Sequence, residues 1–380
     1  MLIGIDGNEA NVKERVGVNV YVFELLCAIW KLQNEWAQKH RLIVYLKSPP
    51  LSDMPEESSR FKYKVIPGGK AWVLTKLMPD LFFAKPRPDI FFSPNHYIPP
   101  LAPMPRICSI MDLGYLEFSG QFKKWVFWQL RYWSAISICI SKRVIAISNS
   151  TKQDIVRHYP FASKKTFVTP LAYDASRFHN HIAKEDVRRI REKYSIVGDY
   201  ILFLSTLKPS KNIESLLEAF SSLNISISQY LNIQLVIAGK KGWMYKSIFK
   251  KTKDLGLDGR VIFTDFVPEE DKPALIAGSR VFVLPSFWEG FGLDALSAMA
   301  CGVPVVVSNV GSLPEVVGEA GILIDPNNPS EIAKGIIKVL SLDKEEQRKL
   351  LEKGIKQAKK FSWEKTARET VKILEDAAKR

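Results

Sequence analysis

The most informative stretch of the sequence is Ser286-Phe287-Trp288-Glu289-Gly290-Phe291-Gly292-Leu293-Asp294. It leads into a helical run and then into the apolar run Val303–Val307. Glycines flanking Phe291 predict a turn whose successive backbone N–H groups are exposed at the start of a helix, and such a turn attracts oxyanions. Because the Glu289 carboxylate would repel an anion, we expect it to face hydroxyl groups, as a sugar supplies. The alternative is that Glu289 is a surface residue.

Outward from this stretch, short apolar runs alternate with helical patterns along the whole chain, which predicts parallel sheets covered by helices on both faces. The length of 380 residues suits two such α/β domains. We expect a break near residues 170–195 and a last helix, Glu364–Ala378, capped by Ser362. The predicted strands are Leu2–Ile5, Leu42–Tyr45, Ile90–Phe92, Ile107–Ile110, Val144–Ile147, Ile201–Leu204, Gln234–Ala238, Val261–Thr264, Val281–Leu284 and Val303–Val307.

The composition argues against several classes of protein: disulfide-stabilised, metal-dependent, membrane-spanning and nucleic-acid-binding. The four cysteines are far apart, the five histidines form no ligand pattern, and no two aspartates stand two residues apart, so we expect neither a disulfide framework nor a metal. No apolar run reaches the roughly 18 residues that span a bilayer, and the start lacks a signal-peptide pattern, so a cytoplasmic protein is expected. The net charge of +14 indicates either an anionic partner or a solvated basic surface. Since no recognition motif accompanies the charge, no nucleic-acid partner is expected.

Two further loops follow predicted strands and carry chemistry that suits a phosphate. The loop at 7–19 ends with Gly17 at the start of a helix, where a glycine lets a diphosphate approach the backbone. The loop at 204–212 places Lys211 just before a helix, where its ammonium can reach a phosphate. Each has a plainer interpretation: Gly17 as a packing glycine and Lys211 as a surface lysine.

Taken together, the landmarks resemble the retaining glycosyltransferases of family 4, also called glycosyltransferase group 1, with the GT-B fold. They lie in family order and include Lys211-Asn212, residues 239–243, Phe266-Val267-Pro268, residues 286–304, residues 312–316 and Phe361-Ser362-Trp363. The resemblance implies two Rossmann-like, doubly wound domains facing across a cleft. Residues 1–183 would form the acceptor domain, with helix 364–380 packing back on it, and residues 184–363 would form the nucleotide-sugar donor domain.

The resemblance also implies roles for individual residues. Lys211 would neutralise the leaving diphosphate, and Glu289 would bind hydroxyls of the donor sugar. With Asp112 these two residues form the predicted catalytic set. Gly17 would let its loop close over the diphosphate, while Val267 and Gly239-Lys240 would flank the base. The whole predicted donor-binding set is Gly17, Lys208, Gly239, Lys240, Val267, Gly290, Phe291, Gly292, Leu293 and Ser297.

Several positions depart from the family pattern. The second glutamate of the family, which grips the ribose, is Ser297 here, and Asp294 is expected to supply a carboxylate from one turn earlier. The arginine that accompanies the lysine is absent, so Lys208 is expected to stand in as a point charge. The usual His-Asp pair is Met111-Asp112, which assigns Met111 and His96 to the acceptor side. These departures leave open a catalytically impaired binder of nucleotide-sugars or glycans.

Residues 122–133 combine six aromatic side chains with three cations. Such a segment suits the interface of an anionic membrane, which would accompany a lipid-linked acceptor; the alternative is a core helix whose cations reach out to water. The leading prediction is a metal-independent, mannosyltransferase-like hexosyltransferase of polysaccharide biosynthesis without a cofactor. It would act on a glycan or lipid-linked acceptor, in the cytoplasm or at the inner face of the membrane.

Overall fold

A computed structural model describes residues 1–36, 39–226 and 232–379. The chain divides into two compact units: Met1–Ala172 with Ser362–Arg380, and Tyr173–Phe361. The sequence analysis places the boundaries later, after residues 183 and 363. Residues 173–183 are grouped with the second unit, and one reason is Arg177, whose guanidinium lies 3.6 Å from the Glu269 carboxylate of that unit.

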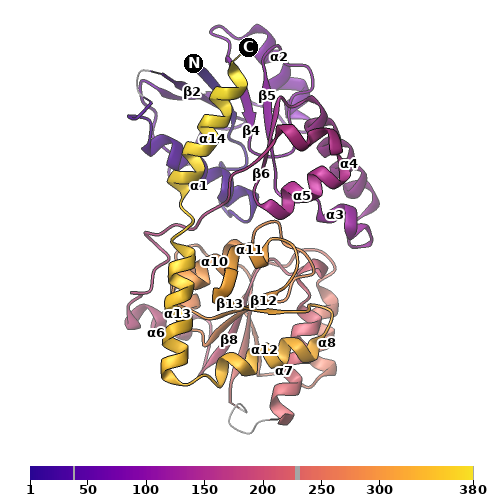
Figure 1. Ribbon diagram of the computed structural model, residues 1–380, viewed down its shortest axis with the longest axis vertical. Helices are drawn as coiled ribbons and strands as arrows, with labels where there is room; N and C mark the ends of the chain where they lie inside the picture. The colour runs from indigo at the N-terminus through magenta and orange to yellow at the C-terminus, as the bar shows by residue number, and fades with distance from the viewer. Residues whose placement is uncertain (37–38, 227–231, 380) are drawn as a thin grey trace. The chain divides into compact units, whose positions relative to one another are not determined.

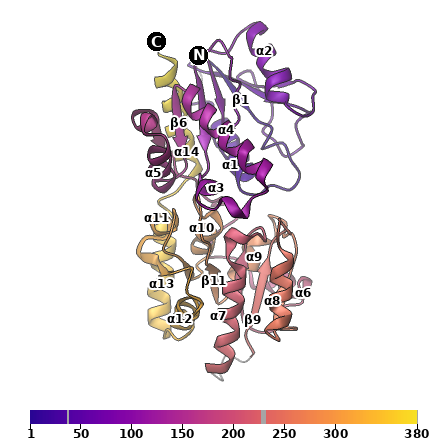
Figure 2. The same cartoon turned by 90° about the vertical axis from the view of Figure 1, so that its right-hand side faces the viewer.

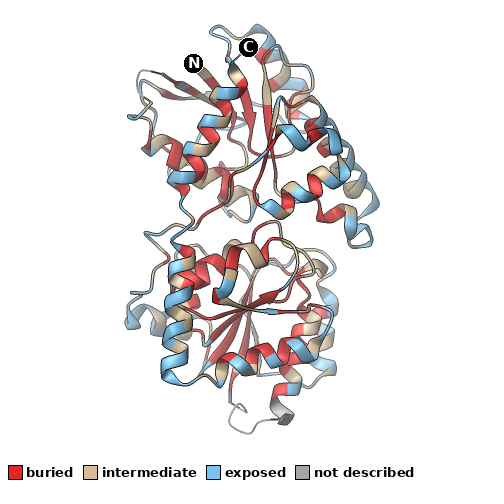
Figure 3. Cartoon of the chain, in the orientation of Figure 1, coloured by how far each residue is buried: buried red, intermediate tan, exposed pale blue. Residues whose placement is uncertain are grey.

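The first unit is built on a seven-stranded parallel sheet in the order β3-β2-β1-β4-β5-β6-β7. Its central strands are buried along nearly their whole length, as strands between two layers of helices must be (Figure 1, Figure 3). The strands are β1 Leu2–Asp6, β2 Arg41–Leu46, β3 Phe61–Val65, β4 Ile90–Ser93, β5 Arg106–Ile110, β6 Arg143–Ala146 and β7 Thr166–Val168. The helices are α1 Val18–Lys31, α2 Met78–Phe83, α3 Gly114–Glu117, α4 Lys124–Ile140, α5 Asn149–His158 and α14 Trp363–Ala378.

The second unit has a six-stranded parallel sheet in the order β10-β9-β8-β11-β12-β13. Helix α7 packs against α8 and α12, and α10 packs against α9 and α13, so helices cover both faces (Figure 2). The strands are β8 Tyr200–Leu204, β9 Gln234–Ala238, β10 Val261–Phe263, β11 Val281–Leu284, β12 Val305–Ser308 and β13 Gly321–Ile324. The helices are α6 Lys184–Lys193, α7 Ile213–Ser226, α8 Lys246–Asp254, α9 Lys272–Ala277, α10 Leu293–Ala300, α11 Leu313–Val317, α12 Pro329–Leu340 and α13 Lys344–Ala358.

Both sheets contain the strand order 3-2-1-4-5-6 when each unit is numbered from its own first strand, and the first sheet adds β7 as a seventh strand at its edge. This is the order of the Rossmann fold, in which the direction of winding reverses between the first and fourth strands. Ligands of such sheets bind beyond the carboxyl ends of the strands at this switch point. The switch points lie between β1 and β4 in the first unit and between β8 and β11 in the second. The expected pair of Rossmann-like α/β domains is therefore confirmed.

All ten predicted strands are present within one to two residues of their predicted ends, and three more exist that the sequence analysis did not predict. The additional strands β3, β7 and β13 all lie at sheet edges. Edge strands are covered incompletely, so they need no continuous apolar run, and their residues are largely half-buried or exposed. Their sequences consequently lack the pattern that marks the central strands.

The last helix, α14, packs on the first unit against α1, β4 and β6 (Figure 1). As predicted, Ser362 caps it, accepting a hydrogen bond from the Lys365 N–H at 3.2 Å. Trp363 packs on Tyr21 of α1 with ring centroids 6.3 Å apart, and Thr366 donates to the Pro170 carbonyl at 2.6 Å. Among the described residues, no helix combines the length and the apolar character that crossing a membrane would need.

Candidate functional site

In the second unit, the two loops that follow the switch-point strands β8 and β11 are joined by hydrogen bonds. The loop after β8 forms a single helical turn, Pro209–Lys211, and ends at Asn212 in a left-handed conformation with φ of 55°. The buried Asn212 amide donates to the carbonyls of Pro285 at 3.0 Å and Pro326 at 2.6 Å. The Phe287 N–H donates to the Ser210 carbonyl at 2.9 Å. These bonds fix the position of Lys211 relative to the loop after β11.

The predicted catalytic residues Lys211 and Glu289 meet at this point. The Lys211 ammonium lies 2.5 Å from Oε1 of Glu289, and each side chain is only 11% exposed. The Ser286 hydroxyl donates to the same oxygen at 2.7 Å. Two charged groups taken this far out of water need such close pairing, because removing one partner would leave a buried charge. The structure therefore brings the cation and the carboxylate together, as one buried pair.

The backbone of Glu289 is held by residues that the sequence analysis did not assign to the site. Ser312 donates to the Glu289 carbonyl through its N–H at 3.2 Å and through its hydroxyl at 3.0 Å. A Cβ at Gly311, where φ is +60°, would lie 2.7 Å from the same carbonyl oxygen. Glycine is therefore required there by both conformation and space. The segment after β12 thus supports the loop after β11.

The turn at 290–293 begins helix α10. Gly292 stands at the N-cap with φ of +96°, and a Cβ there would come within 2.6 Å of the Leu313 side chain. The Phe291 side chain is buried and packs edge-on against Phe361, with centroids 5.6 Å apart. Phe291 therefore anchors the turn in the core. Ser297, also buried, lies one turn further along α10 than Leu293.

Asp294 in the first turn of α10 lies in a charged environment. Burial raises its pKa to about 6, and the cations Lys272 and Lys211 oppose this rise. Lys272, which begins α9, forms an ion pair with Glu269. The sequence analysis missed Lys272, because its relation to Asp294 is created only when α9 and α10 pack together.

The residues predicted to lie near the nucleotide base and its phosphates make contacts within the second unit. A Cβ at Gly239, with φ of +141°, would lie 1.9 Å from the Ser205 carbonyl oxygen, so glycine lets the loops after β8 and β9 touch. The Leu207 N–H donates to the Lys240 carbonyl at 3.0 Å across the same contact. The Lys208 ammonium lies 5.2 Å from the centre of the Trp243 ring, and Val267 is buried. Their donor-binding roles stay predictions.

The first unit carries the remaining predicted residues beyond the carboxyl ends of its strands. Gly17, with φ of +53°, has no atom within 4 Å of a Cβ built on it. The Met111 carbonyl accepts a hydrogen bond from Thr151, and the exposed Asp112 carboxylate accepts one from the Gly114 N–H at 2.9 Å. Burial lowers the pKa of His96 to about 4, and its Nε2 has no partner among the residues that the structure describes. His96 is therefore a neutral imidazole at neutral pH.

An acidic group at the end of β1 was not predicted. Asp6 is buried, and its carboxylate accepts hydrogen bonds from the backbone N–H of Asn8 at 3.1 Å and from its side chain at 2.6 Å. Burial raises the pKa of Asp6 to about 6 and also raises that of Glu9, which accepts from Asn19 at 2.7 Å. The sequence signal that could have indicated this group is the run of polar residues directly after the apolar strand β1.

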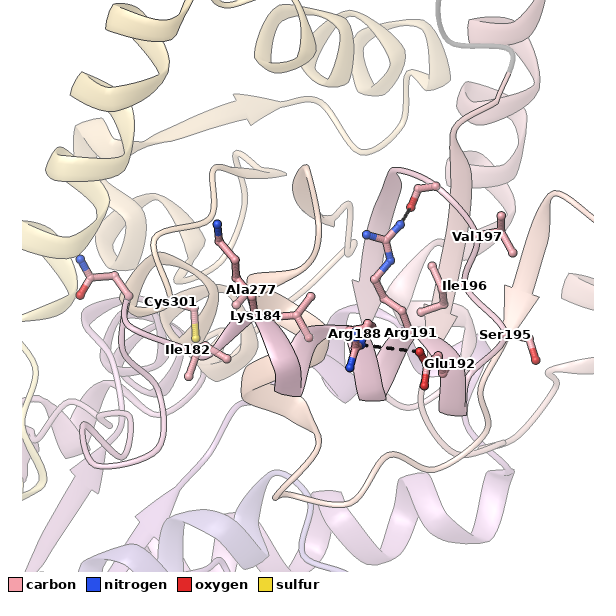
Figure 4. Close-up of a pocket in the computed structure, with 13 residues that line it drawn as sticks. Ile182, Lys184, Arg188, Arg191, Glu192, Ser195, Ile196, Val197, Ala277 and Cys301 are labelled. Atoms are coloured by element: carbon pink, nitrogen blue, oxygen red, sulfur yellow. Dashed lines mark hydrogen bonds and ion pairs between the residues drawn. The ribbon is translucent and has the colours of Figure 1, made fainter.

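A pocket of about 740 Å³ lies elsewhere on the second unit (Figure 4). Its lining comes from α6, from residues 195–198 before β8, and from Ala277 and Cys301 at the ends of α9 and α10. These segments meet the amino ends of β8, β11 and β12, whereas the predicted donor residues follow the carboxyl ends of the strands. The pocket contains none of the predicted site residues.

Comparison with known proteins shows which families and folds this chain is similar to. The family model described as "Glycosyl transferases group 1" matches residues 186–360. The chain is 35% identical over 237 residues to the O-antigen chain mannosyltransferase B of Escherichia coli, covering 62% of this chain and 61% of that protein. It is 33% identical over 226 residues to the serotype-specific mannosyltransferase WbdA of Escherichia coli, covering 59% of this chain and 27% of that protein. The chain thus spans less than two thirds of the length of these relatives.

Among solved structures, the complex of Anabaena Alr3699/HepE with UDP and glucose is similar over nearly the whole chain. The TM-score is 0.75 at 18% identity, and the match covers 98% of this chain and 99% of that one. A likeness at this identity speaks for the fold. The chain therefore has the GT-B fold of two Rossmann-like domains, and its residues 186–360 match the model of the group 1 glycosyl transferases.

Proposed function

We propose that this protein is a retaining, metal-independent glycosyltransferase that moves a hexose, of the mannose class, from a nucleotide-sugar to a glycan or lipid-linked acceptor. The observation that carries the proposal is the buried Lys211–Glu289 pair, which joins the loops after β8 and β11 at the switch point of the second sheet. This is where a Rossmann-like sheet binds its ligand. The mannosyltransferase names of two relatives support the sugar class.

The chemistry follows from what each group can offer. Cleavage of the sugar–phosphate bond leaves negative charge on the diphosphate, and a fixed ammonium such as that of Lys211 stabilises this charge as it develops. The backbone N–H groups of residues 290–293 would bind phosphate or sugar oxygens in the same way. The Glu289 carboxylate would accept hydrogen bonds from sugar hydroxyls. In this assignment the bound donor separates Lys211 from Glu289: its diphosphate contacts Lys211 and its sugar hydroxyls contact Glu289.

The second candidate is a binder that keeps the fold and lacks transfer activity. It is favoured by Ser297 at the position of the ribose-gripping carboxylate and by Met111 at that of the family's histidine. Asp294 and Lys208 are the substitutes that active transfer would need, and Asp294 bears a carboxyl group one turn from Ser297. The transferase and a nucleotide-sugar binder both require the nucleotide to bind, a glycan binder does not, and only the transferase requires product.

The first experiment is a thermal-shift screen of the full chain against UDP, GDP, ADP and the corresponding nucleotide-sugars. A ligand at one hundred times its Kd adds about 2.7 kcal/mol of stability, which is measurable as a raised Tm. We expect one nucleotide to stand out and Lys211→Ala to abolish its shift, while Lys353→Ala on the exposed face of α13 leaves it unchanged. If no nucleotide shifts the Tm, the transferase and the nucleotide-sugar binder both fail, and only a glycan binder is left.

The second experiment separates transfer from binding. The nucleotide-sugar that binds is incubated with glycan acceptors in EDTA, and the anomeric configuration of the product is determined by NMR. We expect product formation in EDTA and the same configuration as in the donor. An inverted product would contradict retention, loss of activity in EDTA would contradict metal independence, and binding without product would favour the non-catalytic binder.

A further inference from the structure

Helix α4 in the first unit has one face that its own domain leaves uncovered. Trp125 is 67% exposed, Trp128 45% and Tyr132 60%. These residues are three and four positions apart, so they form one stripe along the helix, which Ile136 and Cys139 continue. Trp128 and Tyr132 stack with ring centroids 5.5 Å apart and an interplanar angle of 22°. Figure 3 shows α4 with exposed residues along it.

The opposite face of α4 is fixed to the domain. Phe127 and Leu130 pack on the core cluster around Ile110 and Val144, and Ser137 donates to the His96 carbonyl at 2.6 Å. At the end of the helix, the Lys165 ammonium donates to the carbonyls of Cys139 at 2.8 Å and Ser141 at 3.0 Å. The aromatic stripe is therefore held on a rigid element and cannot turn inward without breaking these contacts.

The charges around the stripe have one sign. From residue 118 to residue 153 the sequence contains six Lys and Arg residues and no Asp or Glu. Lys123, Lys124 and Arg131 are exposed near the stripe, and the Arg131 guanidinium lies 5.3 Å from the centre of the Trp128 ring. Glu117, the acidic residue that precedes this segment, is paired with Arg157 and lies 3.2 Å from His158. An anionic partner would meet no exposed carboxylate within this segment.

We propose that the face formed by Trp125, Trp128, Tyr132 and the flanking cations, here called the α4 face, binds an anionic phospholipid surface. Tryptophan and tyrosine rings fit the headgroup region of a bilayer, because one end is apolar and the other can hydrogen-bond. Lysine and arginine beside them are attracted to anionic headgroups. A helix of 17 residues lying flat places the three rings and the cations in the interface together. This inference rests on α4 alone and holds whether or not the proposed transfer reaction is correct.

The test is cosedimentation of the full chain with phosphatidylcholine vesicles, with and without phosphatidylglycerol, at low and high salt. We expect binding to the anionic vesicles only, weakened by salt. K123Q/K124Q/R131Q should reduce the partition coefficient about 100-fold, since each cation near an anionic surface contributes about a factor of five. The control K353Q/K356Q/K359Q removes the same charge from the exposed surface of the second unit and should change binding little.

The aromatic stripe is tested separately with W125S/W128S/Y132S, matched by V197S/M244S at exposed apolar positions of the second unit. We expect the first set alone to lower binding, by at least about 10-fold, when each variant is assayed at a temperature at which its Tm shows it to be folded. A fluorophore on the exposed Cys139 should shift to the blue with anionic vesicles. Equal loss in both sets, or no vesicle binding at low salt, would overturn the proposal. So would self-association of the wild type that W125S/W128S/Y132S abolishes, which would assign the face to a second copy.

Discussion

The two switch points of this chain share a strand order and differ in charge. In the second unit, the loops after β8 and β11 bring Lys211 against Glu289 in a buried ion pair. In the first unit, β1 ends at Asp6 and the loop after it carries Glu9, and the segment after β4 carries His96, whose lowered pKa keeps it neutral. The same backbone plan thus offers a buried ion pair at one switch point. At the other it offers two carboxyl groups of raised pKa, with the cation Lys47 opposing that rise, and a neutral imidazole.

This difference teaches that the strand order determines where a ligand binds and the loops determine which ligand. A diphosphate needs a cation and backbone N–H groups, which the second unit has at its switch point. Hydroxyl groups need carboxyl and amide partners, which the first unit has in Asp6, Glu9 and Asn19. This difference supports the proposal that the donor binds the second unit and the acceptor binds the first.

The largest expected effect is that of Lys211→Ala on transfer. Removing one fixed group that stabilises developing charge costs about 10²–10³-fold in rate. We expect a loss of at least this size in kcat/KM, because the ammonium contacts the diphosphate both in the bound donor and as it departs. Lys208→Ala should cost about 10-fold or less, since Lys208 is half-buried and lies over Trp243. Steady-state kinetics with the nucleotide-sugar found in the thermal screen would measure both.

A stability measurement must accompany these kinetics, because Lys211→Ala also leaves Glu289 without its partner. Breaking a buried pair from one side costs about 3–5 kcal/mol, so the folded fraction has to be checked at the assay temperature. The double variant K211M/E289Q removes both charges and should be more stable than either single variant. If folded Lys211→Ala keeps the wild-type rate, the cation at the second switch point has no role in transfer, and the proposed difference between the two switch points fails.

The next effect in size is that of Gly239→Ala on folding of the second unit. Its Cβ would meet the Ser205 carbonyl oxygen at 1.9 Å, and φ of +141° is unfavourable for alanine. Backbone strain and overpacking together suggest a loss of about 3–5 kcal/mol in the free energy of unfolding. Gly259→Ala is the control, since its φ is +79° but no atom lies within 4 Å. Chemical denaturation should show a much larger loss for Gly239→Ala than for this control.

In the second unit, residues at the switch point could be picked out from the sequence, whereas the residues that support them could not. Lys211, Glu289 and the glycine turn could be found because each follows an apolar run within a few residues. Gly311 and Ser312, which hold the Glu289 backbone, lie in the loop after β12. Lys272 comes near Asp294 only because α9 packs against α10. These relations depend on which loops become neighbours, and no local pattern encodes that. In α4, likewise, packing places Phe127 against the core and leaves Trp125 exposed, a separation that depends on the neighbouring elements.

The third prediction concerns Asp294 and pH. Its pKa is raised to about 6 by burial, so the folded state binds a proton more tightly than the unfolded chain, whose aspartates titrate near 3.8. The stability from this group is present below pH 4 and is lost as pH rises through 6. Asp294→Asn should therefore stabilise the protein at pH 7, by about 2–3 kcal/mol, and have little effect at pH 4. Asp265→Asn, at an exposed aspartate of the same unit, is the control. An equal effect of Asp294→Asn at both pH values would contradict the buried assignment.

The smallest expected effect is that of Gly17→Ala in the first unit. The site has space for a methyl group, so only the strain of this backbone conformation acts, about 1–3 kcal/mol. Gly17 was predicted to admit the diphosphate closely, and a Cβ there would then hinder the donor. A donor KM that rises several-fold while kcat and the fold are kept would indicate that the first unit also contributes to donor binding, which would blur the division between the two switch points. An unchanged KM would leave Gly17 as a glycine required by backbone conformation alone and would sharpen that division.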